Sequence, residues 1–306
     1  MPFVLEVRTI AEAELPAWVE LRARHDPRPA TLEAYLDWAR QAAETAWFMG
    51  SLDGEDAATG IAVLGWHEPP GVARAGIDVV PERRGRGLGS ALLSSAGAWA
   101  RERGCVELLG PVDEDDPASL AWAERRGFRE VGRNSLLVLD LEHVDAPSVD
   151  PPDGIEIVSW AQRPELARGM YEVAREAYPD VPGEGDEMAA FEDWLSVDMQ
   201  GTGDRSEATF VALAGDEVVG YAKFSLGDAR PGVAFHDMTG VKRAWRGRGI
   251  AAALKRAEIA WAKEQGYTRL ETFNEERNEP IRRLNERHGY RIAPGHIVVR
   301  GLIRDA

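Results

Sequence analysis

Two short segments combine arginine and glycine in a pattern suited to binding an anion. The first is Arg84-Gly85-Arg86-Gly87-Leu88-Gly89, and the second is Arg246-Gly247-Arg248-Gly249-Ile250-Ala251. Glycine lets an anion approach the backbone closely, and arginine adds charged hydrogen-bond donors. If a helix begins in each segment, its first N–H groups have no partner within the helix and lie at the positive end of its dipole. The residue types therefore predict two sites for an anion such as a pyrophosphate.

Ionisable side chains shortly before the second segment could accept a proton. Asp237 and His236 lie in an apolar stretch that ends at Val241, where a strand would hold them in place. The residues 162 positions earlier are Ala75 and Arg74, which provide no base. The carboxylate or the imidazole could deprotonate a reacting group, although each side chain could equally belong to the packed structure.

Both segments belong to a repeat that extends through most of the sequence. The same offset of 162 positions relates Phe48 to Phe210, Arg84 to Arg246, Trp99 to Trp261, Gly104 to Gly266, Gly127 to Gly289, and Phe128 to Tyr290. A shared offset of this kind indicates two copies of one fold, each large enough to have its own core. We expect a first domain at 1–142, a linker rich in proline and aspartate at 143–153, and a second domain at 154–306.

The hydrophobic pattern predicts the elements that hold the two segments. In the second copy we expect strands at 154–160, 233–241, 267–274 and 296–303, a hairpin at 208–226, helices at 163–178, 186–199 and 279–289, and a helix from the loop to about Gly266. The first copy repeats this order, with a hairpin at 46–67, strands at 73–80, 106–110 and 135–141, and a helix at 117–127. Each copy is therefore expected to be α/β (α+β), with a mixed, largely antiparallel central sheet and helices on both faces.

Composition and charge restrict the function classes. The chain of 306 residues has a formal net charge of −16, which disfavours nonspecific binding to nucleic acid and to anionic membranes. Its single cysteine excludes an internal disulfide and a cysteine-rich metal site, and no metal is predicted. The segments lack the Gly-Lys-Ser/Thr ending of a Walker loop. Because no leader pattern or membrane-length apolar stretch is evident, we expect a cytoplasmic protein, monomeric or homodimeric.

Both copies resemble the GNAT superfamily of N-acetyltransferases, whose acetyl-CoA signature is Arg/Gln-x-x-Gly-x-Gly/Ala. The residues that match are Arg246, Gly249 and Ala251 in the second copy and Arg84, Gly87 and Gly89 in the first. The segment MTGVKRAWRGRGIAAALK is similar to the family's fourth strand and following helix, and LETFNEERNEPIRRLNERHGY to its fifth strand and the next helix. The whole chain resembles the actinobacterial tandem type, of which mycothiol synthase is an example.

The resemblance implies that acetyl-CoA is the cosubstrate and that an amine attacks its thioester directly. It places acetyl-CoA in a cleft where the fourth and fifth strands separate, with the pyrophosphate on the loop and the pantetheine along the main chain near Val241. The cofactor-binding residues that it implies in the second copy are Val241, Arg246, Gly247, Arg248, Gly249, Ile250, Ala251, Asn274 and Asn278. Those in the first copy are Val79, Arg84, Gly85, Arg86, Gly87, Leu88 and Gly89.

The sequence departs from the family at the tyrosine that often helps the thiolate to leave. That position is Asn285 in the second copy and Ala123 in the first. Asn285 can hydrogen-bond to the sulfur but cannot donate a proton as an acid, so the proton source stays open. The resemblance implies a catalytic set of Asp237, His236 and Asn285, and a degenerate first copy.

The family's first two helices and their connection cover the acceptor site. In the second copy this region contains Tyr178, Asp180 and Trp194, which the resemblance makes candidate substrate-binding residues. Carboxylates there would suit an amine-bearing acceptor, although a plain acidic surface loop is the alternative. They belong to Asp180, Glu184, Asp186 and Glu187.

Two function hypotheses follow. The first is an acetyl-CoA-dependent N-acetyltransferase that acts on a primary amine of a small molecule, with the chemistry in the second copy. The alternative is a noncatalytic, regulatory protein that binds acyl-CoA and keeps the fold. Release of free thiol in the presence of one amine would distinguish them.

Overall fold

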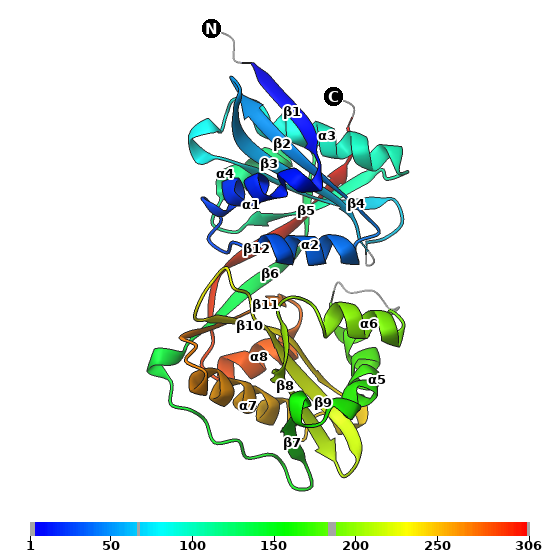
Figure 1. Ribbon diagram of the computed structural model, residues 1–306, viewed down its shortest axis with the longest axis vertical. Coiled ribbons are helices and arrows are strands. Elements are labelled where there is room, and N and C mark those ends of the chain that lie inside the picture. Colours follow the sequence, from blue (N-terminus) through cyan, green and yellow to red (C-terminus); the bar gives the residue numbers. More distant parts are fainter. Residues whose placement is uncertain (1–3, 66–67, 183–187, 305–306) are drawn as a thin grey trace. The chain divides into compact units, whose positions relative to one another are not determined.

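The computed structural model describes residues 4–65, 68–182 and 188–304, which form two compact units. Unit 1 consists of residues 4–133 and 296–304, and unit 2 consists of the described residues of 134–295. Each unit has a central sheet with helices on both faces, so the predicted fold class is confirmed (Figure 1). Within the described part of the chain, no helix is long and apolar enough to span a bilayer.

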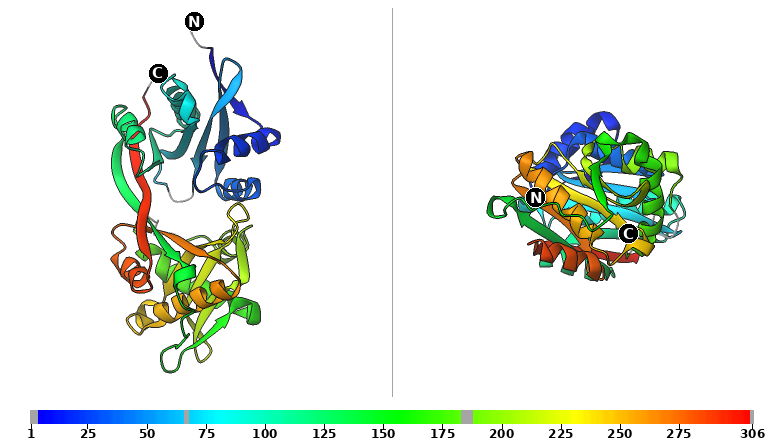
Figure 2. Two further views of the ribbon diagram at one scale, coloured as in Figure 1. Left: turned by 90° about the vertical axis from the view of Figure 1, so that its left-hand side faces the viewer. Right: turned by 90° about the horizontal axis from the view of Figure 1, so that it is seen from below.

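Unit 1 contains the elements of the first repeat in the expected order. They are β1 (Leu5–Ile10), α1 (Leu15–Ala23), α2 (Leu32–Gln41), β2 (Glu44–Leu52), β3 (Glu55–Leu64), β4 (Val72–Val79), α3 (Leu88–Glu102), β5 (Glu107–Asp113), α4 (Pro117–Glu124) and the start of β6 (Arg129–Asp140). The end of β12 (Arg291–Leu302) completes a sheet of order β1-β2-β3-β4-β5-β12, in which β4 and β5 run parallel. The left view in Figure 2 shows α3, in cyan, on one face of this sheet and α1 and α2, in blue, on the other.

Unit 2 repeats this arrangement. Its elements are β7 (Glu156–Ser159), α5 (Ala167–Ala177), α6 (Phe191–Asp198), β8 (Asp204–Ala214), β9 (Glu217–Ser225), β10 (Val233–Val241), α7 (Ile250–Glu264), β11 (Arg269–Glu275) and α8 (Glu279–Arg287). The end of β6 completes a sheet of order β6-β11-β10-β9-β8-β7, in which β10 and β11 run parallel.

The closing strands differ from the division expected from the sequence. Residues 134–140 of β6 pair with β11 in unit 2, and residues 296–302 of β12 pair with β5 in unit 1. The last strand of each repeat therefore enters the sheet of the other repeat, and the expected domains at 1–142 and 154–306 do not coincide with the compact units. The sequence could not show this, because alternating apolar residues predict a strand but not its partner.

Strand β8 shows how one sheet supports two cores. Val211 and Leu213 pack with α5 and α6, whereas Ala212, between them, packs with α7. Successive side chains of a strand point to opposite faces, so a sheet covered on both sides needs apolar residues throughout. The two helical layers thereby hold β10, which lies beside β9, in a fixed position between them.

Helix α7 follows the second anion segment and has the predicted apolar face. Ile250, Leu254 and Ala257 are buried, and Gly266, at a φ of +81°, ends the helical region as expected. The same helix also buries Lys255 and Glu258, which the hydrophobic pattern did not predict.

Candidate functional site

The second anion segment forms an exposed loop that ends at an uncapped helix N-terminus. Gly249 is the N-cap of α7, and no side chain accepts from the first turn. Gly249 and Gly247 have φ values of +86° and +75°, which side chains other than glycine rarely adopt. Residues 246–249 are exposed. The first backbone N–H groups of α7 therefore have the arrangement that the predicted anion site requires.

The two arginines of this loop differ in their contacts. Arg246 Nε donates to the Val241 carbonyl at 2.9 Å, and Arg246 Nη1 lies 2.7 Å from Asp180 Oδ2. Arg248 Nη2 donates to the Ala244 carbonyl at 3.2 Å, and its guanidinium lies 4.6 Å from the centre of the Trp245 ring. Arg246 is thus held at the end of β10, whereas Arg248 folds back on its own turn.

The first anion segment has the same backbone in unit 1. Gly87 is an uncapped N-cap of α3 with a φ of +97°, and Arg84 Nε donates to the Val79 carbonyl at 3.1 Å. Arg84 Nη1 also donates to Asp116 Oδ2 at 2.9 Å, as Arg246 Nη1 contacts Asp180 Oδ2 in unit 2. A carboxylate therefore lies beside the arginine of each loop, and this feature does not distinguish the two units.

Strands β10 and β11 separate soon after they meet. They pair over Val233–Phe235 and Arg269–Glu271, and the pairing stops at Phe235. In unit 1, β4 and β5 pair over an equally short stretch, but a Cβ on Gly110 would lie only 2.3 Å from the Ala75 carbonyl oxygen. Thr272, which has a Cβ, occupies the position of Gly110 in unit 2.

Asp237 is the extra residue of a β-bulge. His236 pairs with Phe224 and Met238 pairs with Lys223, which leaves Asp237 unpaired with β9. The corresponding strand of unit 1 pairs with β3 without a shift. By this pairing, Ala75 is the counterpart of His236, and Asp237 has no counterpart in unit 1. The uniform offset of 162 positions was therefore wrong at this strand, because the bulge adds one residue to unit 2.

A buried lysine holds the carboxylate of Asp237. Lys223 Nζ lies 2.8 Å from Asp237 Oδ2 and 2.6 Å from Asp204 Oδ1, and it also donates to the Asp198 carbonyl. Burial alone would lower the pKa of Lys223, but Asp237 and Asp204 raise it well above its usual value. Since the ammonium has three donors, it is fully used as a fixed cation. The side chain of Asp237 is 42% exposed, so it remains accessible to a ligand.

His236 is not placed to receive a proton from a ligand in solution. Its side chain is 2% exposed and faces α7, where its Nδ1 lies 3.1 Å from Glu258 Oε2. Burial lowers the pKa of His236 to about 4, although Glu258 opposes this shift. This geometry favours a packing role for His236 and not the role of a base.

The asparagines predicted near the thioester fall into two groups. Asn285 Nδ2 donates to Asn274 Oδ1 at 2.8 Å, and Asn274 Nδ2 donates to the Phe273 carbonyl at 2.8 Å. The structure thus brings Asn274 and Asn285 together at the edge of β11, with Asn285 buried. Asn278 is the N-cap residue of α8, and its side chain makes no capping hydrogen bond.

The candidate acceptor residues do not form one open surface. Asp180 lies in the 3-10 helix η6 (Tyr178–Asp180) and binds Arg243 at 2.8 Å in addition to Arg246. Hydrogen bonds from Arg243 and Arg246 lower the pKa of Asp180 to about 2. Trp194 is fully buried in the core under α5 and α6, and Tyr178 is half-buried beside it. Asp180 and Trp194 therefore do not present free surfaces to an acceptor. Glu184, Asp186 and Glu187 lie outside the described residues.

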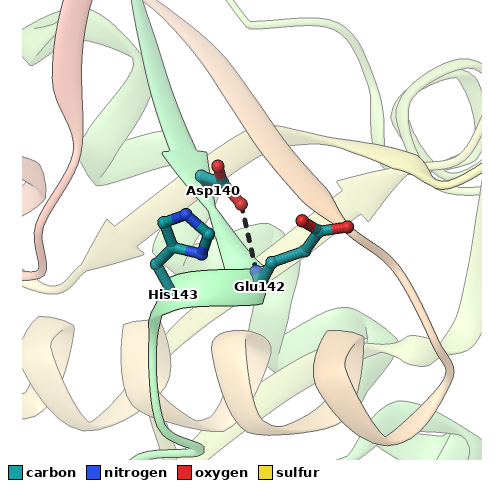
Figure 3. Close-up of side chains that lie close together, drawn as sticks. All are labelled: Asp140, Glu142 and His143. Carbon is teal, nitrogen blue, oxygen red and sulfur yellow. Dashed lines mark hydrogen bonds between the residues drawn. The ribbon is translucent and has the colours of Figure 1, made fainter.

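An exposed group of metal-type ligands lies at the end of β6. Ligand atoms of Asp140, Glu142 and His143 lie within 4.8 Å of one another (Figure 3). Asp140 Oδ1 accepts from the Glu142 N–H at 3.0 Å and so caps the 3-10 helix η3 (Leu141–His143). Capping accounts for the position of Asp140, and all three residues are exposed.

Family models and relatives agree with this geometry. The model of the acetyltransferase (GNAT) family matches residues 7–128 and 167–290, one match for each repeat. The chain belongs to the GNAT acetyltransferase family. It is therefore a tandem GNAT protein, and its relatives support an acyltransferase.

Two curated relatives have named activities. A mycothiol acetyltransferase of Nocardioides sp. is 28% identical over 217 residues, which are 66% of this chain and 71% of the relative. An aminoglycoside N(6')-acetyltransferase type 1 of Stenotrophomonas maltophilia is 30% identical over 150 residues, which are 44% of this chain and 94% of the relative.

Solved structures share the fold of the whole chain. The tandem GNAT protein from the clavulanic acid biosynthesis pathway has a TM-score of 0.80 at 21% identity, covering 99% of this chain and 100% of its own. A GNAT protein of Sphaerobacter thermophilus has a TM-score of 0.76 at 24% identity, covering 99% and 96%. At these sequence identities, the structural similarity shows a shared fold only.

Several polar residues of unit 2 were missed from the sequence. Lys223, Lys255 and Glu258 lie on elements whose pattern is otherwise apolar. The repeat contained a signal for them, because the residues 162 positions earlier are Ile61, Leu93 and Ala96.

Proposed function

We propose that unit 2 transfers an acetyl group from acetyl-CoA to a primary amine of a small molecule. The observation that supports this most strongly is the bulge of β10. It presents Asp237, a half-exposed carboxylate, where β10 leaves β11 and shortly before the anion loop. Unit 1 has the loop but neither the bulge nor a carboxylate at this place.

The residues present fit acetyl-CoA. The uncapped N-terminus of α7 suits a pyrophosphate, and residues 246–249 are exposed, with the Arg246 guanidinium held beside them by Asp180. The backbone of β10 from Met238 to Val241 pairs with β9 on one side, and its pairing with β11 has already ended. That edge suits the amide groups of a pantetheine arm. When bound, acetyl-CoA supplies an acetyl group activated as a thioester.

The residues of unit 2 then have distinct roles in the proposal. Asp237 binds the ammonium of the acceptor and takes its proton, directly or through water, while Lys223 fixes the orientation of the carboxylate. A main-chain N–H at the bulge polarises the thioester carbonyl. Asn285 is buried and its amide donates to Asn274, so we assign it to positioning the end of β11 near the thiol rather than to direct contact with the sulfur.

Unit 1 has a supporting role in this proposal. It has no counterpart of Asp237, the proposed base, and Ala123 stands at the position of Asn285. Strand β6 begins in unit 1 at Arg129, and its residues 134–140 pair with β11 as part of unit 2. We infer that unit 1 has a structural role and that the chemistry is confined to unit 2.

One observation favours a second candidate function. A noncatalytic acyl-CoA-binding protein would not need the tyrosine that Asn285 replaces, and Asn285 has no acidic proton. The acetyltransferase should release free CoA thiol in the presence of its amine, whereas the noncatalytic protein should release none.

The test is to incubate the protein with acetyl-CoA and a panel of amines and to measure free CoA thiol. The panel should include aminoglycosides, other amino sugars, amino acids, polyamines and a mycothiol precursor, because the relatives include enzymes named for two of these classes. Thiol release that depends on one amine supports the acetyltransferase. Tight CoA binding without release for any amine would support the noncatalytic alternative.

A further inference from the structure

Four polar side chains form a buried cluster beneath β10 in unit 2. His236, Lys255, Glu258 and Tyr290 are 2%, 1%, 0% and 4% exposed. Glu258 Oε2 lies 3.1 Å from His236 Nδ1 and 3.8 Å from Lys255 Nζ. The Tyr290 ring centre lies 5.6 Å from the His236 ring centre and 5.6 Å from Lys255 Nζ. The four side chains therefore form one continuous group.

The same place in unit 1 is apolar. The counterparts of Lys255, Glu258 and Tyr290 are Leu93, Ala96 and Phe128, each 162 positions earlier. The counterpart of His236 is Ala75, because Ala75 pairs with Ala62 as His236 pairs with Phe224. All four lie in or against the hydrophobic core of unit 1. The fold thus forms without any polar group at these positions.

Several polar atoms of the cluster also lack hydrogen-bond partners. Among the described residues, neither nitrogen of His236, neither oxygen of Glu258 nor the Tyr290 hydroxyl has a hydrogen bond of ordinary geometry. Burial lowers the pKa of His236 and of Lys255, and Glu258 opposes both shifts. The charges of Lys255 and His288 further lower the pKa of His236. Buried charges and unpaired polar groups cost several kcal/mol relative to apolar side chains of similar shape. Since stability does not explain the cluster, we look to its position.

The cluster joins strand β10 to the residues that follow α8. His236 directly precedes Asp237, the bulged residue, and follows Phe235, where β10 last pairs with β11. Tyr290 follows α8, and its N–H donates to the carbonyl of Asn285 at 3.2 Å. A contact between His236 and Glu258 therefore acts on the bulge, and Tyr290 connects this contact with the residue placed near the thiol.

We propose that His236, Lys255, Glu258 and Tyr290 are positioning residues that hold the β10 bulge and the end of α8 in the geometry of the chemical step. The inference rests on the proposed function of unit 2. The cluster touches neither the anion loop nor the acceptor. It acts through Asp237 and Asn285, so it affects the rate of transfer and leaves the binding of acetyl-CoA unchanged.

The test replaces the cluster with the residues of unit 1, as His236→Ala, Lys255→Leu, Glu258→Ala and Tyr290→Phe together. We expect kcat to fall by about 10- to 100-fold, the usual effect of a small displacement of reacting groups. The KM for acetyl-CoA should change by less than about twofold, because the variant leaves the proposed acetyl-CoA-binding loop unaltered. Thermal melting checks that the variant folds, because His236→Ala and Glu258→Ala remove buried volume as well as polar groups. Ile259→Val, a buried apolar change on the same helix, is the matched control.

A conservative pair of variants covers the case in which the four-residue variant does not fold. Glu258→Gln keeps the length and an oxygen acceptor for His236, so it should retain more of kcat than Glu258→Ala. If kcat is unchanged in the four-residue variant, or if Glu258→Gln and Glu258→Ala both have the kcat of the wild type, this inference is wrong. The proposed function of unit 2 would then still stand. A wild-type protein without turnover on any amine would overturn the proposed function and this inference with it.

Discussion

At the scale of single residues, His236 differs most from its expected role. The sequence placed it beside Asp237 as a candidate base, and the residue types alone could not separate the two. The bulge separates them, because it turns Asp237 outward and leaves His236 facing α7. A bulge depends on the pairing of two strands, so it is invisible in the pattern of one strand.

The burial of His236 predicts a specific dependence of stability on pH. Its pKa falls from 6.5 to about 4 on folding. Between these values the unfolded chain binds a proton that the folded chain does not, so stability falls as the pH falls through this window. The full effect is about 3 kcal/mol. Urea unfolding at pH 7 and at pH 4 should show that wild type loses more stability than His236→Ala. His288 is present in both proteins and cancels in the comparison. Equal losses would show that folding does not lower the pKa of His236.

Other residues of the site were predictable to different degrees. The glycines of both loops follow from their left-handed backbone, which few other residues adopt. The role of Asp180 was not predictable, because its partners Arg243 and Arg246 lie more than 60 positions away. Long-range ion pairs depend on the packing of η6 over the loop, and the sequence pattern predicts elements rather than their packing.

At the scale of elements, the strands and helices could be predicted, but the partners of the closing strands could not. Strands β6 and β12 each contain an apolar stretch that would suit either repeat, because the repeats share one pattern. Which repeat each strand joins depends on how the whole chain folds, and the pattern within one strand does not contain this information.

The bulge of β10 gives a prediction at this scale. Deleting Asp237 gives the strand the length that β4 has between its preceding glycine and Val79 in unit 1. Because the bulged residue is unpaired, its deletion leaves His236 and Met238 on their present faces, and the unit should still fold. We expect kcat/KM to fall by about 10²- to 10⁴-fold in Asp237→Asn, if the carboxylate takes the proton, and further in the deletion. Circular dichroism and thermal melting control for folding. A deletion variant with more activity than Asp237→Asn would show that the bulge does not form the site.

At the scale of the whole molecule, the two copies share their helices and strands but differ in several buried residues. Both retain the anion loop and the diverging parallel strands. Unit 2 alone has the bulge, the buried Lys223 and the cluster around Glu258, whereas unit 1 has Ile61 and Ala96 in the places of these two residues. The repeat itself was readable from the sequence. The proposed division of work between the copies rests on the pairing of their strands, which the sequence does not show.

The central claim is that acetyl transfer takes place in unit 2, and turnover by matched loop variants tests it most directly. Gly249→Glu and Gly87→Glu each place a carboxylate at the N-cap of the helix that follows the loop. Gly249→Ala and Gly87→Ala control for the strain of a side chain at positive φ, and thermal melting controls for folding. With acetyl-CoA and the amine that supports turnover, Gly249→Glu should bind acetyl-CoA at least ~10-fold more weakly, about 1.4 kcal/mol, and lose turnover. Gly87→Glu should keep most of its activity. Loss of turnover in Gly87→Glu, with Gly249→Glu still active, would place the chemistry in unit 1 and contradict the account.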